Sequence, residues 1–373
     1  MLHRYLSAQV LEDAQRKMVF IGGPRQVGKT TLSTTLRPKT ETTYLNWDIS
    51  EHRTAILDGK LGVSPLLVLD EIHKYRRWRG YLKGLYDAMQ VSPGAQRQII
   101  VTGSARLDVY RYGGDSLQGR YHYLRLLPLS VAEVKDETAF KSLLFYGGFP
   151  EPFLAHSATH SKRFSREYRA RLVREDIRDL EAIQDLATME LMLGRLPKLV
   201  GSPLSINSLR EDLQIAHRTA EKWLDVFDRI YATFRLTPLA GKKLRSVKKE
   251  KKLYLFDWTN IDDNGARFEN LVAVHLLKHV FFKQDTLGEE VDLCYFRDSD
   301  GREVDFVITE NGHPIILVEC KYSEQNISQS LRFLHTKYPR AAAWQIYASG
   351  TGDYQSKERI RVAHATKLLK DLT

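Results

Sequence analysis

The 373-residue sequence contains only two cysteines, Cys294 and Cys320. Two cysteines cannot build a disulfide framework, and no Cys/His spacing matches a structural zinc site. This composition is typical of a protein in a reducing compartment, so we expect a cytoplasmic location.

Long hydrophobic runs are also absent. The longest apolar stretch, around Leu271 to Phe282, is interrupted by two histidines and a lysine, which makes it too short and too polar to span a membrane. The N-terminus carries no apolar signal segment. With 43% hydrophobic residues, 27% charged residues and no long low-complexity segment, the chain has the composition of a globular protein of two to four domains. We expect no association with membranes.

Acidic residues are the scarcer charge, with 46 Asp and Glu against 56 Lys and Arg, for a net charge of +10. Excess positive charge favours a polyanionic partner. The densest basic segment lies between Gly241 and Leu253, opposed only by Glu250. Its basic residues are Lys242, Lys243, Arg245, Lys248, Lys249, Lys251 and Lys252.

A glycine-rich segment follows the apolar run Met18–Ile21 and precedes a predicted helix that contains Thr31. It consists of Gly23, Pro24, Arg25, Gln26, Val27, Gly28, Lys29 and Thr30. The pattern G-x-x-x-x-G-K-T in this context is that of a phosphate-binding loop, whose glycines let backbone N–H groups surround an anion. We expect residues 23–31 to bind ATP, with Lys29 at the β- and γ-phosphates and Thr30 as a ligand of Mg²⁺.

A second apolar run, Pro65–Leu69, ends in Asp70 and Glu71. A run that is apolar on both faces predicts a central parallel strand, and α/β sheets bind ligands at the C-terminal ends of such strands. We expect Asp70 to hold Mg²⁺ through water and Glu71 to polarise the attacking water. A buried strand capped by acids for solubility is the alternative, but it does not explain why the acids follow a phosphate-binding loop.

Two further polar residues are candidates for the same site. Ser104 or Thr102, at the end of the predicted strand Gln98–Thr102, could contact the γ-phosphate, although small polar residues at strand ends often serve only as caps. Arg120 could stabilise transition-state charge across a subunit interface, with an ordinary surface role as the alternative.

The chain divides into four segments that differ in their pattern of predicted helices and strands. Residues 1–130 alternate strands and helices around the loop, and residues 131–198 form a helical lid or arm with a charged helix over roughly Ser161 to Leu186. Residues 199–260 form a winged-helix domain, and residues 261–373 form a further domain.

The winged-helix prediction rests on the order of elements in residues 199–260. Helices are predicted over Ser205–Leu213 and His217–Leu224, followed by a third apolar-periodic piece through Ile230. Two strand-like runs, Ala232–Leu236 and Lys252–Phe256, flank the basic segment. The DNA-binding candidates are Arg218, Thr219 and Lys222 on the second helix and Lys242, Lys243, Arg245, Lys248 and Lys249 in the wing. A packing module without DNA contact is the alternative.

The last segment predicts an antiparallel meander over residues 291–296, 303–308 and 315–321, joined by Asp-Gly and Asn-Gly turns. Glu319 and Lys321 share one face, Asp305 can lie beside them, and Glu269 on the preceding helix is an additional ligand or orienting acid. Asp305 and Glu319 could hold Mg²⁺ or Mn²⁺, and the lysine could orient a water for phosphodiester hydrolysis. The alternative is an exposed face of salt-bridged strands.

Together these motifs resemble a prokaryotic family that joins an AAA-type ATPase domain to a C-terminal DUF4143 domain. The resemblance covers nearly the whole chain, and its marks are the segments Phe20–Thr30, Tyr44–Asp48, Leu69–Lys74, Ser116–Arg120 and Gly147–Glu151. Residues 303–305 and 319–321 look like the PD-(D/E)xK nuclease superfamily. The resemblance implies an additional-strand (ASCE) P-loop core, a ring or other homo-oligomer such as a hexamer, and Arg120 as a finger that completes a neighbour's site.

The expected fold class is therefore α/β, with a P-loop AAA/ASCE ATPase core, a helical lid, a winged-helix domain and a restriction-endonuclease-like C-terminal domain. The expected function is ATP hydrolysis coupled to action on branched or free-ended DNA, which the metal-dependent, nuclease-like domain would cut or recognise. The alternative is an ATP-dependent switch or scaffold that binds a protein partner through a catalytically inactive nuclease fold.

Overall fold

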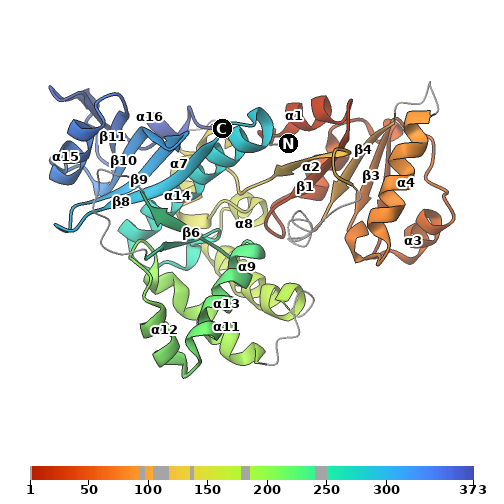
Figure 1. Ribbon diagram of the computed structural model, residues 1–373, viewed down its shortest axis with the longest axis horizontal. Helices are drawn as coiled ribbons and strands as arrows, with labels where there is room; N and C mark the ends of the chain where they lie inside the picture. The colour runs from red at the N-terminus through yellow and green to blue at the C-terminus, as the bar shows by residue number, and fades with distance from the viewer. Residues whose placement is uncertain (1, 92–96, 104–116, 135–137, 178–184, 240–249) are drawn as a thin grey trace. The chain divides into compact units, whose positions relative to one another are not determined.

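The computed structural model describes residues 2–91, 97–103, 117–134, 138–177, 185–239 and 250–373 (Figure 1). It divides into two compact units. The N-terminal unit comprises Met1–Leu127 and Arg229–Tyr231, and the C-terminal unit comprises Pro128–Asp228 and Ala232–Thr373. The division falls close to residue 130, where we expected the ATPase core to end, and each unit is described by itself below.

The N-terminal unit is built on a parallel five-stranded sheet. Its strands are β1 (Met18–Gly22), β2 (Thr42–Asn46), β3 (Leu66–Asp70), β4 (Gln98–Thr102) and β5 (Tyr121–Arg125), in the order β2-β3-β4-β1-β5. Every residue of β1, β3 and β4 is buried, as their continuous apolar runs predict. Strand β4 lies between the loop-bearing β1 and the acid-bearing β3, which is the additional strand that the family resemblance implies.

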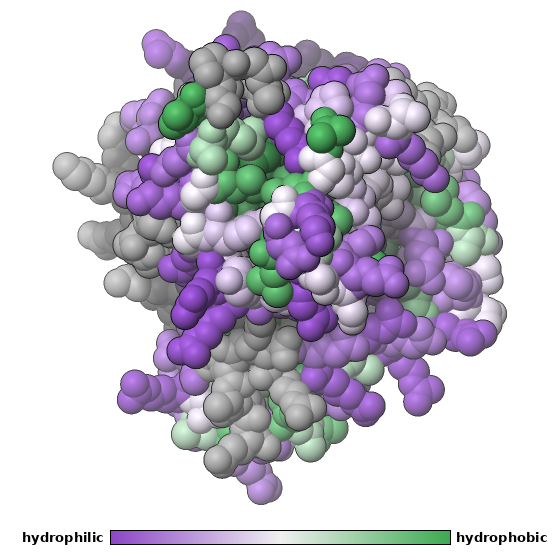
Figure 2. All heavy atoms as spheres, turned by 90° about the vertical axis from the view of Figure 1, so that its right-hand side faces the viewer, coloured by the Kyte–Doolittle hydropathy of each residue, from purple (hydrophilic) through white to green (hydrophobic). Residues whose placement is uncertain are grey.

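Helices cover this sheet. They are α1 (Ser7–Asp13), α2 (Lys29–Thr35), α3 (Ser50–Leu57) and α4 (Trp78–Val91), with 3-10 turns η1 (Lys39–Glu41) and η2 (Ile72–Lys74). Phe20, Leu69, Trp78 and Leu82 belong to one buried cluster between strands and helices. Figure 2 shows the side on which α3 and α4 lie in Figure 1, where hydrophilic residues predominate and hydrophobic ones form small separate patches.

The C-terminal unit contains an eight-stranded mixed sheet. Its strands are β6 (Thr233–Pro238), β7 (Lys252–Leu255), β8 (Val291–Arg297), β9 (Glu303–Glu310), β10 (His313–Ser323), β11 (Ala342–Ser349), β12 (Tyr354–Gln355) and β13 (Ile360–His364). The order is β12-β13-β11-β10-β9-β8-β6-β7. The predicted antiparallel meander β8-β9-β10 is confirmed, while β11 and β13 add in parallel. Because β6 pairs with β8 as well as with β7, the segments we separated at residue 260 share one sheet.

The helices of this unit are α6 (Val131–Val134), α7 (Ala139–Tyr146), α8 (Pro150–Ala155), α9 (Ala158–Arg171), α11 (Leu186–Arg195), α12 (Ile206–Leu213), α13 (His217–Arg229), α14 (Asn264–Phe282), α15 (Gln329–Lys337) and α16 (Thr366–Leu369). The unit also contains two π-helical segments, η4 (Leu172–Ile177) and η7 (Lys283–Leu287), and two 3-10 turns, η5 (Leu196–Leu199) and η6 (Trp258–Asn260). Helix α14 packs on β7 to β10, and α15 packs on β9 to β11. None of the helices in the described ranges has the length and hydropathy that a transmembrane span needs.

Helices α12 and α13 confirm two of the predicted helices and correct a third. Ser205 caps α12 as its sequence position suggests, and Gln214 ends the helix in a left-handed conformation with φ 53°. The predicted second helix and the third apolar-periodic piece are one continuous helix, α13. No glycine or proline interrupts the buried stripe that runs from Ala220 to Phe227, so nothing in the sequence ends the helix at Leu224.

Candidate functional site

The phosphate-binding loop connects β1 to α2. Three of its residues have positive φ: Gly23 (130°), Gln26 (59°) and Gly28 (98°). A Cβ atom on Gly23 would lie 2.1 Å from the carbonyl oxygen of Leu126, so only glycine fits there. The Lys29 ammonium donates to the carbonyl oxygens of Gly23 (3.0 Å) and Pro24 (2.7 Å). These two hydrogen bonds hold the positive charge of Lys29 over the loop, where the sequence predicts phosphate binding.

A buried arginine anchors this loop. The two terminal nitrogens of Arg4 donate to the carbonyl oxygens of Val27 (2.7 Å) and Leu127 (2.5 Å). Arg4 is only 6% exposed, and its two charge-assisted hydrogen bonds hold the loop at Val27 to the segment at Leu127. This residue could not be identified from the sequence, because nothing local marks a lone arginine as a support for a loop more than twenty residues away.

Asp70, at the end of β3, lies at the centre of a set of neutral donors. Its Oδ2 accepts from the hydroxyls of Thr30 (2.9 Å) and Tyr44 (2.8 Å), and its Oδ1 accepts from Thr102 (2.6 Å). Asn46 Nδ2 lies 3.0 Å from the Tyr44 hydroxyl and 3.4 Å from Asp70 Oδ2. Thr30 and Asp70 thus place two hard oxygen atoms side by side, which suits Mg²⁺ with Thr30 as a ligand and Asp70 bound through water; this role stays a prediction.

Glu71 follows Asp70 in a left-handed conformation with φ 56°, and its backbone N–H donates to Thr102 (2.9 Å). Its carboxylate lies 3.4 Å from the Lys74 ammonium and 3.5 Å from His73 Nε2. Burial raises the pKa of Glu71, and the neighbouring Asp70 raises it further, while Lys74 and Lys29 lower it. A carboxylate with a raised pKa beside the metal ligands suits the predicted role of activating water.

Arg120 lies at the other end of the sheet. Its carbonyl accepts from the N–H of Met18, the first residue of β1, whereas the loop follows the last residue, Gly22. The Arg120 guanidinium makes a two-point ion pair with Asp87, at 2.8 and 3.2 Å. The structure therefore does not bring Arg120 to the ATP site of its own chain. Ser104 lies outside the described residues, and its alternative, Thr102, contacts Asp70.

In the C-terminal unit, three of the predicted residues come together. Lys321 Nζ lies 2.8 Å from Glu319 Oε1, which confirms that the two share a face of β10. Asp305 on β9 accepts from the backbone N–H of Cys320 (2.8 Å), so it lies beside them. Burial, then Asp305, raises the pKa of Glu319 to about 7. Glu269 on α14 accepts from the Tyr254 hydroxyl (2.8 Å).

A lysine that the sequence analysis counted in the basic segment lies inside this group. Lys252, on β7, is fully buried, and its ammonium lies 2.5 Å from Glu303 Oε1, 3.7 Å from Glu269 Oε1 and 3.8 Å from Asp305 Oδ1. Burial disfavours its charge, but Glu269, Asp305 and Glu303 raise its pKa above the ordinary value. We call Lys252, Glu269, Glu303 and Asp305 the lysine-centred cluster.

The lysine-centred cluster does not fit a resident divalent cation, because an ammonium group already lies among its carboxylates. Across the described ranges, no three or more His, Cys, Asp or Glu side chains are placed to hold a metal ion. A divalent cation held by protein alone needs several oxygen ligands. The assignment of Asp305 and Glu319 as metal ligands stays a prediction.

The candidates for DNA contact fall into two groups. On α13, Arg218 and Lys222 are exposed and Thr219 is half-buried. Lys242, Lys243, Arg245, Lys248 and Lys249 lie outside the described residues.

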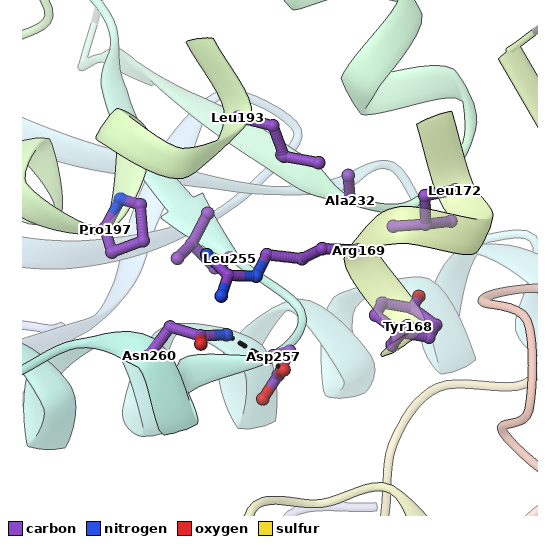
Figure 3. Close-up of a pocket in the computed structure, with 9 residues that line it drawn as sticks. All are labelled: Tyr168, Arg169, Leu172, Leu193, Pro197, Ala232, Leu255, Asp257 and Asn260. Atoms are coloured by element: carbon purple, nitrogen blue, oxygen red, sulfur yellow. Dashed lines mark hydrogen bonds between the residues drawn. The ribbon is translucent and has the colours of Figure 1, made fainter. Parts of the chain in front are cut away.

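A small pocket in the C-terminal unit is lined by none of the predicted site residues (Figure 3). Arg169, Leu193, Leu255 and Asn260 are among its lining residues, and the Arg169 side chain extends between Leu255 and Asn260. Asn260 donates to Asp257 at 3.1 Å. Ser165 on α9 donates to Asp257 and accepts from Asn260, so polar contacts beside the pocket hold η6 and α9 together.

Comparison with known families divides the chain into three parts. Residues 15–135 match the AAA_14 family (AAA domain), residues 137–259 match DUF8612 and residues 264–368 match DUF4143, the last two being domains of unknown function. The chain therefore contains an AAA-type P-loop ATPase domain and a DUF4143 domain, as the motifs indicate. The likeness of DUF4143 to PD-(D/E)xK nucleases stays a prediction.

Among similar proteins, the uncharacterized protein Rv2008c of Mycobacterium tuberculosis is 26% identical over 333 residues, which cover 84% of this chain and 73% of that protein. The Walker-type ATPase PABY2304 of Pyrococcus abyssi aligns with a TM-score of 0.42 and 14% identity over 72% of this chain and 96% of that chain. The Orc1 protein of Aeropyrum pernix, solved in complex with DNA, aligns with a TM-score of 0.32 and 14% identity over 73% and 93%. TM-scores below 0.5 do not establish a shared fold, so no conclusion rests on these two structures.

Proposed function

We propose that this protein is an AAA-type ATPase that hydrolyses ATP and acts on DNA. The observation that carries the ATPase activity is the convergence of Lys29, Thr30 and Asp70: the ammonium lies over the loop, and the hydroxyl lies 2.9 Å from the carboxylate. These are the parts that phosphoryl transfer from ATP to water requires.

In this mechanism, Lys29 exchanges its contacts with the loop carbonyls for the phosphate oxygens of ATP. Thr30 and Asp70 would hold Mg²⁺, and a cation there would supply positive charge near the phosphate oxygens. Glu71 accepts a proton from the attacking water as the bond to the ADP oxygen breaks. Tyr44 and Thr102 orient the Asp70 carboxylate by donating to it.

Arg120 is proposed to act on a neighbouring subunit of a homo-oligomeric ring. Its position at the opposite end of β1 from the loop supports this role, since it cannot serve its own site. Release from Asp87 would free the guanidinium to stabilise transition-state charge in the neighbour.

Action on DNA is supported by charge and by the order of elements in the C-terminal unit. Helices α12 and α13 are joined by a three-residue turn, and the antiparallel strands β6 and β7 follow, which is the order of a winged helix. The exposed Arg218 and Lys222 would contact phosphates, together with the wing residues Lys242, Lys243, Arg245, Lys248 and Lys249.

Two forms of this proposal differ in the role of the C-terminal domain. In one, the domain cuts DNA at Asp305, Glu319, Lys321 and Glu269 with Mg²⁺ or Mn²⁺. In the other, it recognises branched or free-ended DNA without cutting. The element order α14-β8-β9-β10-α15-β11 supports a nuclease-like fold for both forms, and the buried Lys252 favours recognition.

The ATPase proposal is tested with the purified full chain. Lys29→Ala should abolish ATP hydrolysis, while Lys60→Ala, which removes an exposed lysine of the same unit, should leave it unchanged. Unchanged turnover in Lys29→Ala would show that the loop is not the site of hydrolysis.

DNA action is tested by anisotropy with single-stranded, duplex, forked and four-way DNA across a salt series, and by the effect of each DNA on ATP turnover. Arg218→Ala and Lys222→Ala should each weaken binding and reduce the salt slope by about 1. Lys370→Ala, which removes an exposed lysine of α16's C-cap, is the matched control. The rival, an ATP-dependent switch that binds a protein partner, gains support if turnover and binding ignore every form of DNA.

A further inference from the structure

The lysine-centred cluster is a group of carboxylates that already contains its cation. Lys252 Nζ lies within 3.8 Å of Glu303, Glu269 and Asp305, which come from two different elements, β9 and α14. We propose that Lys252, from the part of the chain that matches DUF8612, takes the position of a divalent cation among the carboxylates of the DUF4143 domain, so that this domain works without a metal ion and does not cut DNA. The inference rests on the proposed function and decides between its two forms.

Lys252 is held where it is by its backbone and its surroundings. It opens the edge strand β7, where it pairs with Leu236 of β6 on one side and makes a bridge to Pro203 on the other. The ring of Tyr295 lies 5.4 Å from the ammonium and adds a cation–π contact. A fully buried side chain with these neighbours cannot move into solvent without opening the strand edge.

The acidic partners are fixed as well. The Glu269 carboxylate accepts from Tyr254 and lies against Gly201, where an added Cβ would come within 3.0–3.2 Å of its carboxyl atoms. Glu303 has a second partner in Arg297, 3.4 Å away. The cluster is therefore a packed ion network in which three carboxylates share one buried ammonium, and Glu303 also pairs with Arg297.

A divalent cation at Asp305 would have to lie close to this ammonium. Mg²⁺ and Mn²⁺ bind carboxylate oxygens at little more than 2 Å, and Asp305 Oδ1 is only 3.8 Å from Lys252 Nζ. Repulsion between like charges in a buried site is strong, so the lysine opposes metal binding. Lys321 is different: it is partly exposed and pairs with Glu319.

The test measures Mn²⁺ binding by electron paramagnetic resonance on the full chain without nucleotide or DNA. The wild-type protein should show no saturable Mn²⁺ site that depends on Asp305 or Glu319. Lys252→Met, which removes the charge at similar length, should gain one such site, and adding Asp305→Asn should remove it again. Lys251→Met is the matched control, because Lys251 is the exposed neighbour on the same strand edge, and it should gain none.

Two results would overturn the inference. One is a saturable Mn²⁺ site in the wild-type protein that is lost in Asp305→Asn or Glu319→Gln. The other is a folded Lys252→Met that gains no site. If Lys252→Met does not fold, the wild-type measurement alone decides. Because ATP and DNA are left out, failure of the proposed ATP hydrolysis or DNA binding would not imitate either result. The two results bear only on whether the C-terminal domain holds a metal ion for cutting DNA.

Discussion

Asp70 and Asp305 are both largely buried carboxylates on β-strands, yet their surroundings differ. Asp70 is surrounded by neutral donors, the hydroxyls of Thr30, Tyr44 and Thr102. Asp305 has the Lys252 ammonium 3.8 Å away. Neutral donors orient a carboxylate and leave its charge to attract a metal ion, whereas an ammonium cancels that charge.

This difference explains how one chain can contain two carboxylate sites with different chemistry. The N-terminal site is suited to a cation that arrives with a nucleotide and leaves with the product. In the C-terminal site, the cation is part of the polypeptide and cannot exchange. A sequence motif of acids and lysines therefore does not by itself identify a metal site; the position of every neighbouring cation must also be known.

The largest expected effect is on the stability of the lysine-centred cluster. Lys252→Met should lower the free energy of unfolding by about 3–5 kcal/mol, because it leaves buried carboxylates without compensation. Lys251→Met should change it by no more than about 0.5 kcal/mol, as is usual for an exposed site. Chemical denaturation followed by tryptophan fluorescence measures both.

A double variant separates the effect of charge on stability from the effect of packing at Lys252. Adding Glu303→Gln to Lys252→Met should recover part of the lost stability, since it removes one of the uncompensated carboxylates. Equal stability of Lys252→Met and Lys251→Met would mean that Lys252 contributes no compensation.

At the Asp70 carboxylate, a substitution should lower the rate of ATP hydrolysis. Asp70→Asn keeps the shape of the side chain but removes the charge that holds Mg²⁺, so kcat for ATP hydrolysis should fall at least about 100-fold. Asp58→Asn, an exposed residue that pairs with Lys60, should leave kcat unchanged. Steady-state phosphate release measures both, and a kcat for Asp70→Asn within a few-fold of wild type would argue against metal binding at Asp70.

The positions of the phosphate-binding loop and of the acids after β3 could be predicted from the sequence, because this information is local. The loop between β1 and α2 and the acids at the end of β3 are continuous motifs whose spacing determines their geometry. Tyr44 and Asn46 were missed as donors to Asp70, although their segment marked the family resemblance. Tyr44 and Asn46 reach Asp70 because β2 pairs with β3. The order of the strands in the sheet cannot be derived from a local motif.

The C-terminal site shows where sequence reasoning failed. Glu319 and Lys321 could be placed on one face from strand periodicity alone. Lys252 was grouped with the surface lysines because the preceding residues are basic, and only the pairing of β7 with β6 and Pro203 reveals that it is buried. Charge along the chain does not report burial, which depends on contacts between distant segments.

The stability of the C-terminal unit should also depend on pH, through the buried histidine His275. His275 accepts from the N–H of Val131 (3.1 Å) and lies 2.8 Å from the carbonyl oxygen of Leu271, and burial lowers its pKa to about 4. Between pH 6.5 and 4 the unfolded chain takes up a proton that the folded protein does not, so this group destabilises the fold as the pH falls.

The variant His275→Gln isolates this contribution. Wild type should lose about 2 kcal/mol more unfolding free energy than His275→Gln between pH 7 and pH 5, as follows from the linkage of pKa to stability. Denaturation at the two pH values measures the difference. Parallel pH profiles would mean that His275 is protonated in the folded protein.

The smallest expected effect concerns the neutral donors around Asp70. Tyr44→Phe removes one hydrogen bond to the carboxylate, which keeps Thr30 and Thr102 as donors. We therefore expect the lower end of the contribution of a hydrogen bond to a charged group, about 1.5 kcal/mol, so kcat/KM for Mg-ATP should fall roughly ten-fold. Burial raises the pKa of Tyr44 to about 12, so the hydroxyl remains a donor throughout the assay range and the loss should not depend on pH. Tyr86→Phe is the control, because it removes a hydroxyl that donates to Arg16, before the start of β1. If excess Mg²⁺ restores the activity of Tyr44→Phe, the Tyr44 hydroxyl acts in metal binding. If the activity stays low, the hydroxyl orients Asp70 during hydrolysis. Activity equal to that of Tyr86→Phe would mean that the neutral donors do not distinguish Asp70 from Asp305.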